Sequence, residues 1–267
     1  MVIPMNKKGE LVISEFDKLL SEKTKIVTVN HISNALGTVN PIEYIIKKAH
    51  GVGAAVLIDG AQATPHLRPD VQALDCDFYV FSGHKVFGPT GIGAIYGKKE
   101  LFATMYPYQG GGNMIADVTF EKTVYQEAPN KFEAGTGNIA DAVGLGAAID
   151  YVSKIGIENI YKYEHELLEY AISKMTEISG LRLIGTAKEK TSVLSFVLDG
   201  YETQKVGEYL TSKGIALRFG HHCAQPILRR FGVETTVRPS IAFYNTKDEI
   251  DFLVATIKEF KNSHFRG

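Results

Sequence analysis

Hydrophobic positions in the first hundred residues alternate between short apolar runs and helical patterns. The segments KIVTVNH (25–31), AAVLID (54–59), FYVFS (78–82) and IGAIYG (92–97) are rich in β-branched and aromatic residues, which predicts strands. Between the first two, PIEYIIKKAHG (41–51) has apolar residues at helical spacing, a proline at its start and a glycine at its end, and this predicts a helix. Strands that alternate with helices favour an α/β fold with a largely parallel sheet.

The pattern becomes irregular over residues 106–138, where a glycine triplet at 110–112 is typical of a long loop. A helical pattern resumes at residue 139 and is broken at Gly156. We therefore expect a large domain over residues 1–138. A linking helix and a small C-terminal α+β domain are expected over residues 139–267.

The C-terminal part mixes both kinds of element. TSVLSFVL, IALR and VRPSIAFY have the β-branched composition of strands, and helical patterns surround Val206 and Leu253. Thr246 with Glu249 three residues later forms a capping box, which predicts the start of the last helix.

Composition narrows the function classes. Of 267 residues, 29 are Lys or Arg and 30 are Asp or Glu, and a net charge of −1 gives no field that would attract nucleic acid or an anionic membrane. Two cysteines are too few for a disulfide framework and are typical of a reducing compartment. The first ten residues do not have the pattern of a secretion signal, and no apolar run approaches the length of a membrane span. We expect a cytoplasmic protein with a small-molecule substrate.

Two residues with complementary chemistry follow predicted strands. Asp59 ends AAVLID, and Lys85 follows FYVFS in the sequence SGHK. A pyridoxal-phosphate site needs a lysine for a Schiff base and a carboxylate that keeps the pyridine nitrogen protonated. Neighbouring strands can bring both residues to one edge of a sheet. An aspartate at a strand end is also a common cap, and a loop lysine is usually a solvated charge, so their spacing leaves both interpretations open.

Groups suited to a phosphate lie beside Lys85. Ser82 and His84 supply a hydroxyl and an imidazole, and GPTGIG (88–93) supplies a glycine-rich backbone that can approach an anion or simply make turns. The segment lacks the lysine and hydroxyl residue that complete a nucleotide-binding P-loop.

A second cluster of polar residues occupies RFGHHCAQP. Cys223 follows two histidines, and a cysteine beside imidazoles can be a thiolate nucleophile, although a lone cysteine is more often a small buried hydrophobe. Three consecutive residues rarely bind one ion and no second ligand pair is present, so we expect no metal site. Arg238 lies among apolar residues in VRPSIAFYN, where a guanidinium can bind a carboxylate or pair with an acidic residue.

Seven motifs together carry a family resemblance: HISNALG, DGAQ, FYVFSGHK, GPTGIG, FEAGTGN, RFGHHCA and VRPSIAFYN. Their order and spacing resemble those of group II cysteine desulfurases, the Suf-type enzymes related to selenocysteine lyases. The resemblance implies the fold type I of pyridoxal-phosphate enzymes and a homodimer. It implies conversion of L-cysteine to L-alanine with a persulfide on the cysteine of RFGHHCA, passed to a sulfur-acceptor protein of the Suf system for iron–sulfur cluster assembly.

The same resemblance implies a role for each site residue. In this sequence they are Lys85 for the Schiff base, Asp59 for the pyridine nitrogen, Gln62 for the ring oxygen, Ser82 and His84 for the phosphate, Thr136 for the phosphate bound in the partner subunit, Asn34 and Arg238 for the substrate carboxylate with Arg218 close by, and Cys223 for the persulfide.

The chain departs from the family's pattern at its start, because it begins at a point that lies well inside the large domain of the family. The segment before that point ordinarily carries a phosphate-binding turn and a histidine that stacks on the pyridine ring. Two alternatives to a cysteine desulfurase therefore stay open. One is a selenocysteine lyase, and the other is an inactive remnant that acts as a binding partner.

Overall fold

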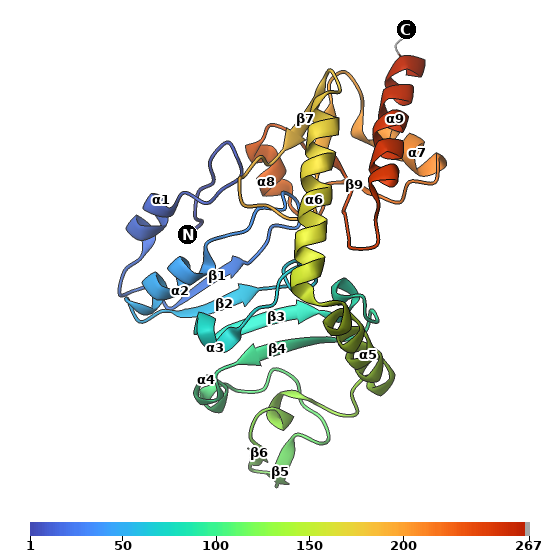
Figure 1. The fold of residues 1–267 in the computed structure, drawn as a ribbon. Coiled ribbons are helices and arrows are strands. Elements are labelled where there is room, and N and C mark those ends of the chain that lie inside the picture. Colours follow the sequence, from blue (N-terminus) through green and yellow to red (C-terminus); the bar gives the residue numbers. More distant parts are fainter. Residues whose placement is uncertain (265–267) are drawn as a thin grey trace. The chain divides into compact units, whose positions relative to one another are not determined.

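The computed structural model describes residues 1–264, which form two compact units (Figure 1). The mixed-sheet unit comprises residues 22–29 and 42–155. Among the described residues, the antiparallel-sheet unit comprises 1–21, 30–41 and 156–264. These two compact units do not test the functional domains expected at residues 1–138 and 139–267, which stay a prediction.

A four-stranded sheet forms the mixed-sheet unit, in the order β1 (Ile26–Asn30), β2 (Ala55–Asp59), β3 (Phe78–Ser82) and β4 (Gly93–Gly97). All four strands lie within the segments predicted from the sequence. Strands β2 and β3 are parallel, as expected, whereas β4 runs antiparallel to β3. The ten-residue connection between β3 and β4 explains the difference, because a parallel partner needs a longer crossover, usually with a helix.

Helix α2 (Ile42–His50) buries the apolar face that the sequence predicts. The other elements of this unit are α3 (Val71–Leu74), the 3₁₀ helices η1 (Gly83–Val86) and η2 (Asn130–Phe132), α4 (Lys99–Thr104), the hairpin of β5 (Ile115–Val118) and β6 (Thr123–Tyr125), and α5 (Ile139–Ile155).

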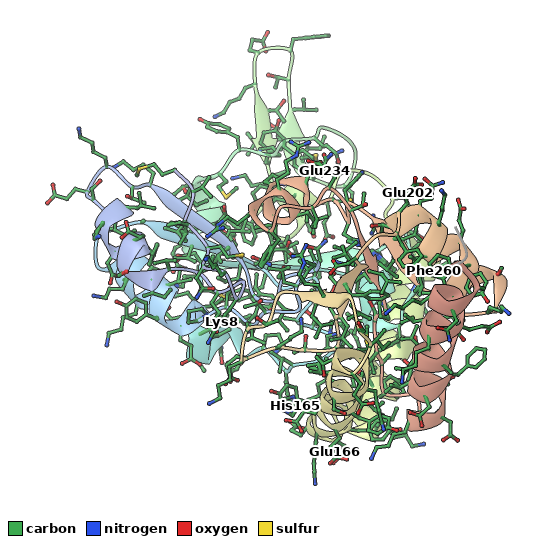
Figure 2. All side chains as sticks on the ribbon, turned by 90° about the horizontal axis from the view of Figure 1, so that it is seen from above. Lys8, His165, Glu166, Glu202, Glu234 and Phe260 are labelled. Atoms are coloured by element: carbon green, nitrogen blue, oxygen red, sulfur yellow. The ribbon has the colours of Figure 1, made fainter. Side chains whose placement is uncertain are left out.

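The other sheet is antiparallel throughout, in the order β7 (Leu181–Ile184), β8 (Ser195–Leu198), β10 (Thr236–Arg238) and β9 (Arg218–Gly220). The helices of this unit are α1 (Ile13–Leu19), α6 (Ile157–Thr176), α7 (Thr203–Ser212), α8 (Gln225–Arg230) and α9 (Lys247–His264). Phe196 of β8 and Phe260 of α9, which is labelled in Figure 2, are fully buried in its core. Within residues 1–264, no helix combines the length and the apolar character needed to cross a membrane.

Three local predictions can be checked in this unit. The capping box is confirmed, because the Thr246 backbone N–H donates to the Glu249 carboxylate and the Glu249 N–H donates to the Thr246 hydroxyl. The helix break at Gly156 is also confirmed, at a φ of +92° that favours glycine. The strand predicted in VRPSIAFY ends earlier, at Arg238, because the following proline has no N–H to continue the ladder.

Residues 30–41 follow β1 in sequence but belong to the antiparallel-sheet unit. Thr38 forms an isolated antiparallel bridge with Lys190. Gly37 has a φ of +74°, and a Cβ on it would lie 2.5 Å from the carbonyl oxygen of Thr191, so only glycine allows this approach. This packing places the predicted site residue Asn34 on the same unit as Cys223.

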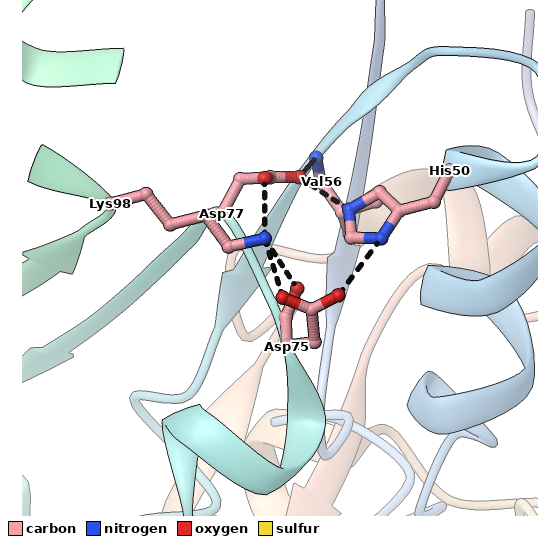
Figure 3. A network of polar contacts seen from close by, with 5 residues as sticks. All are labelled: His50, Val56, Asp75, Asp77 and Lys98. Carbon is pink, nitrogen blue, oxygen red and sulfur yellow. Dashed lines mark hydrogen bonds and ion pairs between the residues drawn. The ribbon is translucent and has the colours of Figure 1, made fainter. Parts of the chain in front are cut away.

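A polar network ties together the starts of β2 and β3 (Figure 3). The buried Asp77 carboxylate accepts hydrogen bonds from the Val56 N–H at 2.6 Å and from the His50 Nε2 at 2.7 Å, and it lies 3.2 Å from the Lys98 ammonium. Lys98 also pairs with Asp75 at 2.6 Å. The network lies at the opposite end of these strands from Asp59 and Ser82, so it stabilises the sheet away from the candidate site.

Candidate functional site

The carboxyl ends of β2 and β3 bring two predicted residues to one edge of the mixed sheet. Asp59 is the last residue of β2, Ser82 is the last residue of β3, and these strands are parallel. His84 and Lys85 lie in η1, which begins directly after β3. In open α/β sheets this edge is where ligands bind.

The turn after Asp59 is closely packed. Gly60 lies against the ring of Tyr79, and a Cβ on Gly60 would be 2.0 Å from that ring. The Gly60 N–H donates to the Val80 carbonyl at 2.8 Å, and the Ala61 N–H donates to the Asp59 carboxylate at 2.9 Å. The turn therefore fixes the backbone of Asp59 while its carboxylate stays exposed.

Two residues that the sequence analysis did not single out support this turn. The Thr64 hydroxyl donates to the Gly60 carbonyl at 2.9 Å, and the ring of the buried His66 lies 3.4 Å from the Gln62 amide nitrogen. Threonine and histidine two and four residues after Gln62 carried no signal, because side chains at that spacing serve many structural purposes.

A tight turn also holds the backbone around Lys85. The Gly83 N–H donates to the Ile92 carbonyl at 2.8 Å, and the Gly88 N–H donates to the Gly83 carbonyl at 3.0 Å. A Cβ on Gly83 would lie 2.7 Å from the Ile92 side chain. Lys85 is half-buried in this turn, whereas the neighbouring His84 is exposed.

In the glycine-rich segment 88–93, side chains bind the backbone of Gly91. The Gly91 N–H donates to the Asp141 carboxylate at 3.0 Å, and the Asn138 amide donates to the Gly91 carbonyl at 3.2 Å. Both backbone groups of Gly91 are thus occupied by side chains from the start of α5.

Thr136 is exposed in the loop before α5. Among residues 1–264 its side chain has no hydrogen-bond partner, and no described contact joins it to Lys85 or Asp59. Its implied role toward a partner subunit stays a prediction.

The antiparallel-sheet unit has a candidate site of its own, around the exposed thiol of Cys223. A guanidinium nitrogen of Arg218 lies 3.6 Å from the Cys223 sulfur. Arg218 on β9 is directly opposite Arg238 on β10. Two like charges in opposed positions repel each other, so an anion bound between them would be stabilised.

Asn34 joins Arg238 to the segment of residues 221–223, which is called the cysteine loop. The Arg238 Nη1 donates to the Asn34 carbonyl at 2.8 Å, and the Asn34 amide donates to the His222 carbonyl at 2.9 Å. The Nε of Arg238 is buried and has no hydrogen-bond partner among the described residues. Burial and the neighbouring Arg218 lower the pKa of Arg238, and the nearby Cys223 thiol acts in the opposite direction.

The rings of the two histidines beside Cys223 form hydrogen bonds with backbone groups. The His221 Nδ1 accepts a hydrogen bond from the Cys223 backbone N–H at 3.1 Å. The His222 ring is buried with its Nε2 against the carbonyl of Thr236, so Nε2 carries the proton and Nδ1, which has no partner in the described part of the chain, does not. Burial and the nearby Arg238 lower the pKa of His222 to about 4. The charged side chain that contacts the thiol is Arg218.

Comparison with known proteins shows the family of this chain. The sequence profile of the aminotransferase class-V family matches residues 1–253. The chain belongs to the class-V aminotransferase family. Among class-V aminotransferase relatives, a cysteine desulfurase of Synechococcus elongatus is 62% identical over 260 residues, which are 97% of this chain and 42% of the relative. A cysteine desulfurase of Dickeya dadantii is 49% identical over 95% of this chain and 62% of its own length.

Solved structures show the same class-V aminotransferase fold. The crystal structure of the cysteine desulfurase CsdA from Escherichia coli superposes with a TM-score of 0.94 at 37% identity, and the match covers 98% of this chain and 65% of that one. The expected fold type I is thereby confirmed. The chain spans less than two thirds of the length of each of these three relatives.

Class-V aminotransferases depend on pyridoxal phosphate, and the residues present at the mixed-sheet edge fit this cofactor. Lys85 would supply an amine for its aldehyde, Asp59 an exposed carboxylate for its ring nitrogen, and Gln62 an amide for its ring oxygen. Ser82 and His84 would supply donors for its phosphate. The cradle is tight where Gly60 and Gly83 pack against their neighbours.

Proposed function

We propose that this protein is a pyridoxal-phosphate-dependent cysteine desulfurase, in which Lys85 binds the cofactor and Cys223 receives the sulfur. It would convert L-cysteine to L-alanine and supply sulfur for iron–sulfur cluster assembly. The protein would act as a homodimer in the cytoplasm. It would pass sulfur to an acceptor protein of the Suf type. The curated relatives named above support it, since both are described as cysteine desulfurases.

One observation carries the proposal: an exposed thiol lies beside two opposed arginines. Arg218 contacts the Cys223 sulfur at 3.6 Å and is paired across the sheet with Arg238, which has an unpartnered buried Nε in the described structure. An amino-acid substrate has a carboxylate for the arginines. Its side-chain sulfur would then be brought to the thiol, so the geometry favours sulfur transfer over other reactions of this family.

The chain's own residues account for the proton and electron movements. When bound, the cofactor withdraws electrons from the α-carbon of the substrate. Lys85 would remove the α-proton, and Asp59 would hold a proton at the ring nitrogen of the bound cofactor. Cys223 attacks the substrate sulfur, so that an S–S bond forms and the substrate C–S bond breaks. The electron pair of that bond stays with the β-carbon, which takes up a proton. The α-carbon would take its proton back from Lys85 to give L-alanine, and the persulfide remains on Cys223.

Two variants test the proposal on the full chain. With added pyridoxal phosphate, the wild-type protein should show a visible absorbance band and release sulfide from L-cysteine in the presence of a reductant. Lys85→Ala should lose both the band and the sulfide. Cys223→Ala should keep the band and lose the sulfide. Identical spectra of wild type and Lys85→Ala would contradict the cofactor assignment, and undiminished sulfide from Cys223→Ala would contradict the nucleophile.

A further inference from the structure

Three consecutive carbonyl groups in the segment after β1 are each bound by a different side chain. The Asn34 carbonyl accepts from Arg238, the Ala35 carbonyl accepts from the hydroxyl of Ser195, and the Leu36 carbonyl accepts from the ammonium of Lys190. These donors come from β10, β8 and the segment before β8. The turn of residues 34–36 is thus fixed by long-range side-chain bonds as well as by its own backbone.

The donors are buried where a polar group is costly. Lys190 is 5% exposed and Ser195 is 1% exposed. Burial lowers the pKa of Lys190 to about 8, which reflects the cost of placing an ammonium group in this position. An apolar side chain would avoid that cost, but it would leave the Leu36 carbonyl without this donor.

The turn of residues 34–36 also holds the cysteine loop. Its Asn34 side chain donates to the carbonyl between His222 and Cys223 at 2.9 Å. His222 and Cys223 both have left-handed backbone conformations, with φ values of +53° and +56°. Non-glycine residues in this region are strained, and they stay there only where neighbouring groups hold them. The Asn34 amide is one such group.

We propose that Lys190 is a positioning residue for Cys223. Lys190 acts through the turn of residues 34–36 and the Asn34 amide, and it thereby holds the Cys223 thiol beside Arg218. The purpose of this arrangement rests on the proposed function. The arrangement itself concerns only the antiparallel-sheet unit and does not depend on the cofactor.

The reactivity of the thiol provides a test without cofactor or substrate. Cys76 is fully buried and burial raises the pKa of its thiol, so alkylation of the native chain by iodoacetamide reports on Cys223. Lys190→Met and Asn34→Ala should each slow alkylation by at least about threefold, because a displaced sulfur loses the nearby guanidinium. Lys188→Met, an exposed lysine two residues away, should react at the wild-type rate.

A double variant distinguishes positioning from general weakening of the fold. If Lys190 acts through Asn34, then Lys190→Met combined with Asn34→Ala should be no slower than Asn34→Ala alone. Independent, multiplicative effects would overturn the proposal, and so would a folded Lys190→Met protein that reacts at the wild-type rate. If Lys190→Met does not fold, Ser195→Ala decides the question, because it removes the adjacent bond with a smaller change and should also slow the reaction. Failure of the desulfurase proposal would appear separately, as absent sulfide release with these alkylation rates unchanged.

Discussion

In the mixed-sheet unit the proposed cofactor residues are positioned by backbone turns, whereas in the antiparallel-sheet unit the proposed substrate residues are positioned by side-chain hydrogen bonds. Asp59 and His84 are exposed on tight turns that have close-packed glycines. Asn34 and Arg238 are partly buried and bonded to each other across 204 residues of sequence. The first arrangement leaves functional groups open to a ligand. The second holds one nucleophile in one place.

Asp59→Asn should give the largest effect, which is a loss of the activity that depends on the cofactor. The change removes the negative charge but keeps the size of the side chain and an acceptor for the Ala61 N–H. Because the backbone turn stays intact, we expect pyridoxal phosphate to bind while sulfide release falls by about 100-fold or more. Asp150→Asn, at an exposed position of α5, is the matched control. Equal activity of both variants would remove Asp59 from the site.

Asp77→Asn should destabilise the mixed-sheet unit without changing the chemistry. The variant breaks the buried network of His50 and Lys98, and we expect the free energy of unfolding in urea to fall by about 3 kcal/mol. Burial raises the pKa of Asp77, but hydrogen bonds from His50, Val56 and Lys98 outweigh burial and lower the pKa below its ordinary value of 3.8. The wild type should therefore lose this stabilisation as the pH falls through the lowered pKa, and the variant should not.

His222→Gln should change the pH dependence of the other unit. The folded-state pKa of about 4 lies below the ordinary value of 6.5, so neutral His222 stabilises the fold above pH 6.5 and this is lost as the pH falls toward 4. Glutamine can keep a donor toward Thr236 without this titration. Hydrogen exchange at pH 7 and pH 5 should show acid loosening of the cysteine loop that is reduced in His222→Gln, by an amount on the order of 1 kcal/mol. Asp77→Asn should leave that loosening unchanged, and a shared response of both units would contradict the contrast.

Arg218→Gln should give the smallest effect. Its guanidinium lies 3.6 Å from the Cys223 sulfur on an exposed surface, so the loss of its charge should slow alkylation by roughly fivefold. Arg230→Gln, on the exposed face of α8, serves as the control. Added salt should reduce the difference between wild type and Arg218→Gln, because exposed charges are screened. A salt-independent difference would indicate a change of loop structure instead.

Much of this contrast follows from what a sequence can encode locally. Apolar periodicity predicted the strands β1 to β4, and residue types at strand ends predicted the edge where Asp59 and Lys85 lie. Glycine, proline and the capping box marked where helices begin and end. These signals depend on neighbouring residues, which is why they could be recognised.

The features that could not be predicted from the sequence depend on hydrogen bonds between residues far apart in the chain. Nothing in HISNALG indicated that this segment packs with the antiparallel sheet, because Asn34 meets His222 across 188 residues. Two histidines beside a cysteine suggested an activated thiol, whereas the structure uses both rings for backbone support and places Arg218 at the sulfur. Such assignments depend on which strands pair, and local patterns do not specify pairing.

The most direct measurement is the location of sulfur on the chain after incubation with pyridoxal phosphate and L-cysteine. Mass spectrometry of peptides should find one added sulfur atom on the peptide of Cys223, none on that of Cys76, and none on either in Lys85→Ala. A persulfide that forms equally in Lys85→Ala, or a wild-type Cys223 that never gains sulfur, would contradict the account.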